Sequence, residues 1–190
     1  MNLSNKLTIS RIFLAFVLMY FLFAKWPGAK YFAFFTFAAA SLTDYFDGYF
    51  ARKEGKMTDF GKLMDPIADK ILVLAALLAF VELELIPAWT VVIIMAREVT
   101  VTGLRIAALS RGKVIEAEEA GKHKTVSQMI AISMILIFLM LREAGKSLAF
   151  WNTDTERWVL NLIFFVMLVT VAFTLTSGVS FFIRNRKLFN

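Results

Sequence analysis

The chain has 190 residues, of which 59% are hydrophobic, with a mean hydropathy of +0.68 and a formal net charge of +6. The lack of cysteine excludes disulfides and thiol chemistry, and a single histidine excludes a histidine-rich metal site. The apolar excess, with 20 Phe, is typical of a lipid-facing surface. No basic run interleaved with aromatic residues indicates a nucleic-acid-binding module, so we expect no nucleic-acid partner.

Six apolar stretches predict six membrane-spanning helices. Each is about 17 residues or longer, which is enough to cross about 30 Å of hydrocarbon. No repeat or linker divides the chain, so we predict an all-α, polytopic membrane protein with one domain, residues 1–190. The helices are expected at 7–24, 31–52, 61–83, 88–110, 125–141 and 158–183.

The first expected helix opens with three polar residues, Asn5, Thr8 and Arg11. Their three-residue spacing places them on neighbouring parts of one helix face. From the residues alone, this is an interfacial cap whose arginine extends toward the headgroups.

Acidic residues gather where the second expected helix ends and the third begins. Asp44 and Asp47 are three residues apart and Asp65 and Asp69 are four apart, so each pair projects from one helix face. Carboxylates at a membrane edge are costly unless a cation compensates them, and hard divalent cations prefer oxygen ligands. We therefore predict an Mg²⁺ or Mn²⁺ site formed by these four aspartates. Pro66 is tolerable only near a first turn, which predicts that the third helix begins close to Asp65.

The fourth expected helix carries Arg97, Glu98 and Arg105 inside its apolar stretch. Charges in a spanning helix usually face a bundle interior or a water-filled cavity. A polar loop or short amphipathic segment, 111–124, follows and contains Lys122 and Lys124. We expect the single histidine, His123, to lie at the membrane interface.

Six spans place both termini on one side of the membrane. That side holds sixteen of the 21 Lys and Arg residues. Cytoplasmic segments carry an excess of Lys and Arg, so we predict that both termini and the aspartates face the cytoplasm of a bacterial-type cell membrane.

From Asp44 to Asp69 the chain reads D-x-x-D-G-x-x-A-R-x8-G-x-x-x-D-x-x-x-D, which resembles the signature of the CDP-alcohol phosphotransferase family. Every fixed position is present, and Asn5, Thr8 and Arg11 match the family's N-x-x-T-x-x-R pattern. Many members have Pro where this chain has Ser4. The resemblance implies a homodimeric membrane enzyme that uses a divalent metal, with Asp69 also acting as the base.

The same resemblance implies CDP-diacylglycerol as the lipid substrate. Arg52 is the best candidate for holding a substrate phosphate, because arginine is always charged and binds bidentately. Gly48 and Gly61 allow close approach of a nucleotide, or alternatively of a neighbouring helix. The implied binding set is Asn5, Thr8, Asp44, Gly48, Ala51, Arg52 and Gly61.

Two further runs resemble the phosphatidylglycerophosphate synthase branch of that family. Residues 97–105 resemble its R-E-x-x-V-T-G-L-R run, and residues 121–125 resemble its G-K-x-K-T. Arg97, Arg105, Lys122 and Lys124 would then bind a phosphorylated acceptor, sn-glycerol 3-phosphate. Interfacial side chains without a ligand are the alternative for these four cations.

Two other functions remain open at this point. Within the family, the chain could be a cardiolipin or phosphatidylinositol-phosphate synthase. From another class, it could be a small cation-coupled transporter with the aspartates as its ion site. Such transporters often show repeated halves and a site near the membrane midplane, neither of which the sequence indicates.

Overall fold

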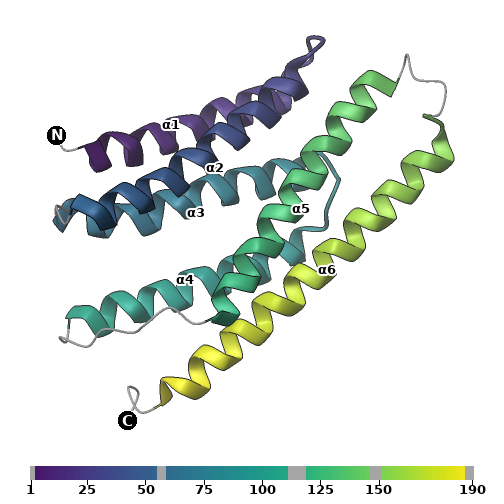
Figure 1. The fold of residues 1–190 in the computed structure, drawn as a ribbon. Helices are drawn as coiled ribbons and strands as arrows, with labels where there is room; N and C mark the ends of the chain where they lie inside the picture. Colours follow the sequence, from purple (N-terminus) through teal and green to yellow (C-terminus); the bar gives the residue numbers. More distant parts are fainter. Residues whose placement is uncertain (1–2, 55–58, 111–118, 146–150, 187–190) are drawn as a thin grey trace.

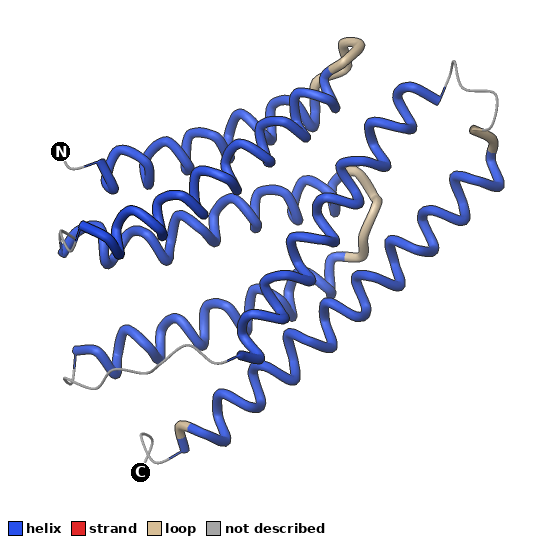
Figure 2. Tube along the Cα trace, in the orientation of Figure 1, coloured by secondary structure: helices blue, strands red, loops and turns tan. Residues whose placement is uncertain are grey.

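The computed structural model describes residues 3–54, 59–110, 119–145 and 151–186, with side chains at 9–43, 70–109, 121–145 and 151–186. These residues form six α-helices, and the described chain contains no strand (Figures 1 and 2). The predicted all-α fold is therefore confirmed. The helices are α1 (Leu3–Phe23), α2 (Ala29–Glu54), α3 (Asp59–Glu82), α4 (Ala88–Ser110), α5 (Glu119–Ala144) and α6 (Thr153–Arg184).

Two helices begin five or six residues earlier than the apolar pattern predicted. Helix α5 starts at Glu119 instead of residue 125, and α6 starts at Thr153 instead of residue 158. Asn152 caps α6, because its side chain accepts a hydrogen bond from the backbone N–H of Thr155 at 2.8 Å. The first turn of each helix is polar, so an apolar pattern places the start too late.

Helix α3 also begins before the predicted start, at Asp59, which puts Pro66 at its eighth position. Proline lacks the N–H that would bond one turn back, so a position beyond the first turn carries a cost. The helix continues through Pro66. Our expectation that Asp65 and Pro66 lie near the helix start was therefore wrong by about one turn.

The six helices form two connected groups. Helix α1 packs against α2 and α3, while α6 packs against α4 and α5 (Figure 1). Helix α5 also contacts α2 and α3, and α3 contacts α4. Helix α5 and the contact between α3 and α4 therefore join the two groups.

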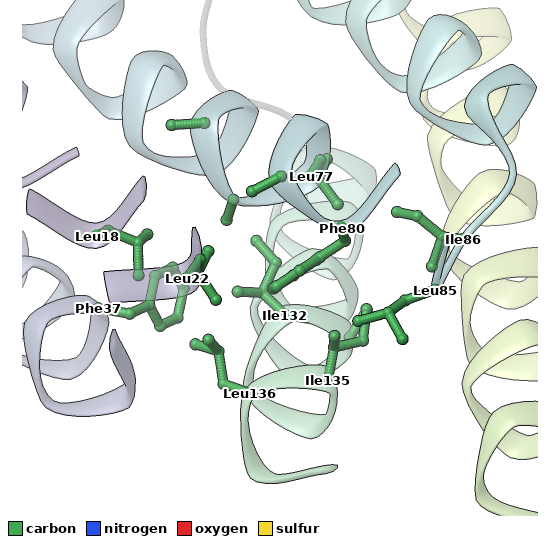
Figure 3. Packing of buried hydrophobic residues seen from close by; sticks show 14 of the residues in the cluster. Leu18, Leu22, Phe37, Leu77, Phe80, Leu85, Ile86, Ile132, Ile135 and Leu136 are labelled. Atoms are coloured by element: carbon green, nitrogen blue, oxygen red, sulfur yellow. The ribbon is translucent and has the colours of Figure 1, made fainter. Parts of the chain in front are cut away.

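Aliphatic and aromatic side chains, among them residues of α1, α2, α3 and α5, fill the centre (Figure 3). Leu18 and Leu22 of α1 meet Phe37 of α2, Phe80 of α3 and Ile132 of α5, and each is at most 2% exposed. Buried alanines on α2 and α3 let the backbones approach, as is common between membrane helices. This core fixes the relative positions of α3 and α5, whose further residues line the cavities below.

At one end of the bundle, Glu143 of α5 holds the start of α2. Its carboxylate accepts hydrogen bonds from the backbone N–H groups of Gly28 and Lys30. The Lys30 ammonium donates to the carbonyl oxygens of Leu22, at 2.6 Å, and Ala24, at 3.0 Å. Gly28 has a φ of +93°, a conformation that favours glycine. These contacts satisfy groups at both helix ends and tie the α1–α2 turn to α5.

Large apolar side chains cover the outward helix surfaces. Phe13, Phe16, Phe35 and Trp158 are each more than 60% exposed. Water-soluble proteins rarely expose so much contiguous apolar surface, so this surface fits contact with lipid. Within the described residues, two segments are long and apolar enough to cross a membrane, Gly121–Ala144 and Thr153–Arg184, and Ile9–Phe23 is a shorter apolar helix. The six-span topology and the side on which the termini lie stay predictions.

Candidate functional site: a basic cavity beside the aspartate helices

The predicted metal ligands lie on two adjacent helices. Asp44 and Asp47 belong to the second half of α2, and Asp65 and Asp69 to the first half of α3. The connected ends of α2 and α3 lie together at one end of the molecule (Figure 1). Both segments are helical, as the spacing argument required, and carboxylate oxygens at these spacings fit the donor chemistry of Mg²⁺.

The side chains of the four aspartates lie outside the described residues. The same is true of the other positions assigned to CDP-diacylglycerol. The metal and nucleotide assignments therefore stay predictions. Those other positions are Asn5, Thr8, Gly48, Ala51, Arg52 and Gly61.

A buried carboxylate next to α3 organises three cations. Glu98 of α4 is 7% exposed and forms ion pairs with Lys70 at 3.3 Å, Arg97 at 3.1 Å and Lys124. Lys124 is itself 5% exposed. Three cations around one carboxylate leave a net positive charge, and their attraction to Glu98 offsets the cost of burying them. The cluster joins α3, α4 and α5, and its member on α3, Lys70, is the residue directly after Asp69.

Arg97 extends this cluster to the last helix. Its guanidinium donates a hydrogen bond to the Ser177 hydroxyl of α6 at 2.7 Å. The next residue, Gly178, lies against the stem of Arg97, since a Cβ built on it would be 3.3 Å from the Arg97 Cγ. The guanidinium of Arg97 is therefore positioned from two sides, by Glu98 and by Ser177.

A cavity of about 430 Å³ opens beside this cluster and is called the basic cavity. Arg105 lies over the ring of Phe181, with its Cζ 5.8 Å from the ring centroid, which holds the guanidinium by a cation–π contact. The Nε atoms of Arg97 and Arg105 are buried without a hydrogen-bond partner among the described residues. An anion in the cavity could accept from such donors. The charged residues that line it are Lys70, Arg97, Glu98, Arg105, Lys122 and Lys124.

The four cations assigned to the acceptor, Arg97, Arg105, Lys122 and Lys124, thus line one cavity, although they come from two helices. Lys122 and Lys124 lie on α5, where the sequence predicted a loop or short amphipathic segment. The binding role of the four stays a prediction.

Sequence reasoning missed Lys70 and Ser177 as parts of this site, and it noted Glu98 only as a charge inside an apolar helix. A charge inside an apolar helix was the available signal for Lys70, as it was for Glu98. Ser177 carried no comparable signal, because its role depends on a residue 80 positions away.

A second, smaller cavity of about 190 Å³ adjoins the basic cavity and is called the inner cavity. The two share Lys70, Glu98, Lys124 and Thr125. The other lining residues of the inner cavity include Arg11, Ser41, Val73, Met95, Gln128 and Met129.

The inner cavity is lined in part by α2 and α3, the helices that carry the aspartates. Ser41 precedes Asp44 by three residues on α2, and Val73 follows Asp69 by four residues on α3. Ser41 and Val73 are thus each about one helical turn from an aspartate position. Arg11 of the N-x-x-T-x-x-R pattern lines the same cavity and is 3% exposed.

His123 is exposed on α5, and its ring stacks on Phe173 of α6 with the centroids 6.4 Å apart. It does not line either cavity. Its predicted place at the membrane interface stays a prediction.

The family model of the CDP-alcohol phosphatidyltransferases matches residues 1–176. This chain belongs to the CDP-alcohol phosphatidyltransferase family. The match contains both aspartate pairs and all four acceptor-side cations. Membership makes the protein a transferase of the CDP-alcohol phosphatidyltransferase kind, which decides against the cation-coupled transporter.

Curated members of the family are similar over most of this chain. A Bacillus subtilis protein named CDP-diacylglycerol–glycerol-3-phosphate 3-phosphatidyltransferase is 38% identical over 97% of this chain and 95% of its own length. A Rickettsia bellii protein of the same name is 35% identical over 99% of this chain and 97% of its own. A Mycobacterium tuberculosis protein named probable phosphatidylglycerophosphate synthase is 42% identical over 72% of this chain and 66% of its own.

Proposed function

We propose that this CDP-alcohol phosphatidyltransferase transfers the phosphatidyl group of CDP-diacylglycerol to sn-glycerol 3-phosphate. The products are phosphatidylglycerol phosphate and CMP. The names of the similar family members support this choice of substrates. The basic cavity supports it independently, because it supplies the charge that a phosphorylated acceptor requires.

The basic cavity is the single observation that carries the choice of acceptor. Five cations and one carboxylate line it, so it remains positive after Glu98 is paired. Arg97 and Arg105 present planar guanidinium groups, which match phosphate oxygens bidentately. An acceptor without a phosphate, such as serine or choline, would leave this excess of positive charge uncompensated.

We assign the four aspartates of α2 and α3 to a divalent metal, Mg²⁺ or Mn²⁺. When bound, such an ion neutralises the pyrophosphate and its leaving group. The residues assigned to CDP-diacylglycerol, including Arg52, would hold the nucleotide end of the lipid substrate beside these helices. Its acyl chains would then extend along the apolar outer surface.

Phosphoryl transfer depends mainly on positioning and on stabilisation of charge. The basic cavity would fix the acceptor by its phosphate, with the primary hydroxyl directed toward the start of α3. Asp69 would accept the hydroxyl proton as the oxygen forms a bond to the phosphorus that carries diacylglycerol. The bond from that phosphorus to the CMP oxygen breaks, and CMP leaves.

We also propose that the protein is a multi-pass protein of a bacterial-type cell membrane and acts as a homodimer. The excess of Lys and Arg on the side of the aspartates supports a cytoplasmic active site. The exposed apolar surfaces of α1, α2 and α6 support contact with lipid or with a second copy.

The test is CMP release by the purified protein from CDP-diacylglycerol with a panel of acceptors and Mg²⁺. We expect sn-glycerol 3-phosphate to give CMP and phosphatidylglycerol phosphate in equal amounts. Phosphatidylglycerol, inositol phosphate and serine are the comparison acceptors. Faster CMP release with any of these three would assign the protein to a different branch of the family.

A further inference from the structure

The inner cavity contains a polar side chain to which the proposed reaction assigns no role. Gln128 of α5 is 4% exposed and lines this cavity. Its amide Nε2 has no hydrogen-bond partner among the described residues. An unpaired buried amide is costly, so a ligand that pairs with it gains a favourable interaction.

The position of Gln128 connects it to the basic cavity. Lys124 and Thr125, which line both cavities, precede Gln128 by four and three residues. This spacing puts the three side chains on one face of α5. A small molecule whose phosphate lies in the basic cavity therefore has a continuous path, past Lys124 and Thr125, to the Gln128 amide.

We propose that Gln128 determines acceptor specificity by binding the secondary hydroxyl of the acceptor. This inference rests on the proposed function, since it takes sn-glycerol 3-phosphate as the acceptor. The acceptor has one phosphate, one primary hydroxyl that reacts and one secondary hydroxyl that does not. The basic cavity holds the phosphate, the reaction uses the primary hydroxyl, and Gln128 pairs with the remaining one.

An ester carbonyl of the lipid substrate could also accept a hydrogen bond from this amide. Two observations favour the acceptor. The inner cavity, at about 190 Å³, has room for a short polyol but not for a fatty acyl chain. It also shares four lining residues with the basic cavity, where the acceptor phosphate binds in the proposed function. The lipid ester is the alternative that the experiment separates.

The experiment compares two acceptors in the wild-type protein and in Gln128→Met. The acceptors are sn-glycerol 3-phosphate and 3-hydroxypropyl phosphate, which lacks only the secondary hydroxyl. We expect the wild type to prefer sn-glycerol 3-phosphate by about tenfold in kcat/KM, because a site built to bind a hydroxyl leaves its amide unpaired without it. The preference should fall to about twofold or less in Gln128→Met. This variant should have a lower kcat/KM for sn-glycerol 3-phosphate and an unchanged kcat/KM for 3-hydroxypropyl phosphate.

The ratio of the two kcat/KM values is independent of how much of a preparation is active, so partial misfolding does not change it. Gln128→Leu gives the same readout if Gln128→Met cannot be purified. Ser127→Ala is the matched control. The Ser127 hydroxyl donates a hydrogen bond to the Lys124 carbonyl oxygen of its own helix, and Ser127 lines neither cavity. It should keep the wild-type preference.

An unchanged preference in Gln128→Met overturns the inference. If that variant instead shows a raised KM for CDP-diacylglycerol, the amide binds the lipid ester. Failure of the proposed function looks different, because the wild type would then release no CMP with either glycerol 3-phosphate or its deoxy analogue.

Discussion

Arg97 and Ser177, which are 80 residues apart, are joined by a hydrogen bond of 2.7 Å from the guanidinium to the hydroxyl. The bond connects α4 to α6, and Gly178 leaves room for the arginine stem beside it. Arg97 is thereby held on the wall of the basic cavity while its Nε stays unpaired among the described residues. The last helix therefore contributes to the acceptor site although none of its residues was predicted there.

Gly178→Val tests this contribution. A side chain at Gly178 would displace the Arg97 stem, since even a Cβ lies 3.3 Å from the Arg97 Cγ. Small displacements of a positioning group cost up to about 10² in rate, so we expect kcat/KM for sn-glycerol 3-phosphate to fall by about tenfold or more. Gly103→Val is the control, because a Cβ at Gly103 meets nothing within 4 Å. Equal losses in both variants would argue against a specific role for Gly178.

Glu98→Gln should destabilise the protein strongly. Glu98 pairs with Lys70, Arg97 and Lys124, and the neutral amide would leave the buried Lys124 and two partly buried cations repelling one another. Removing one side of a buried ion pair typically costs about 3–5 kcal/mol. Thermal unfolding in detergent measures the effect as a lowered Tm.

Glu156→Gln is the matched control for this experiment. Glu156 pairs with Arg142 at 2.9 Å, but the Arg142 side chain is 52% exposed, so the pair is worth about 1 kcal/mol or less. A Tm loss for Glu98→Gln no larger than that for Glu156→Gln would contradict the account of the buried cluster.

The proposed metal site is tested by Asp44→Asn and Asp65→Asn. Each removes one carboxylate from a different helix, and we expect each to abolish metal-dependent release of CMP. Titration of Mg²⁺ and Mn²⁺ against CMP release is the measurement. Near-normal turnover with an unchanged metal requirement in either variant would rule out the four-aspartate site.

Asp69→Asn separates the role of a base from the role of a ligand. Loss of a general base lowers turnover by about 10² or more. Binding of CDP-diacylglycerol in the presence of metal should fall much less, because three carboxylates remain. If binding and turnover decline together, Asp69 acts only as a ligand.

The six-span topology can be tested in this cysteine-free chain. Thr153 is exposed at the start of α6, Arg186 is exposed two residues after its end, and Lys25 is exposed in the turn between α1 and α2. Single cysteines at Thr153 and Lys25 should react with an impermeant thiol reagent from outside, and one at Arg186 only from the cytoplasmic side. Labelling of all three from one side would overturn this topology.

The sequence was sufficient to predict the six helices, because long apolar runs and polar interruptions are local properties of the chain. It was not sufficient to place the first turns of α5 and α6. Lys124 enters the bundle only because Glu98 compensates its charge, and that partner lies 26 residues away. The Asn152 cap was a local signal that could have extended α6.

Candidate binding residues could be predicted from the sequence where they occur at short, fixed spacings. Arg97 and Arg105 lie on one helix and Lys122 and Lys124 on another, and the structure brings these pairs to one cavity. Gln128 had no such signal, since a glutamine in an apolar helix stands out only once its burial and missing partner are known.

The most direct test of the account is the effect of Arg105→Ala on the two substrates. We expect KM for sn-glycerol 3-phosphate to rise by about ten- to a hundredfold, the scale of one lost charge-assisted hydrogen bond. The KM for CDP-diacylglycerol should stay within about twofold of the wild-type value, because Arg105 lines the basic cavity only. Equal weakening for both substrates, or for CDP-diacylglycerol alone, would contradict the assignment of this cavity to the acceptor phosphate.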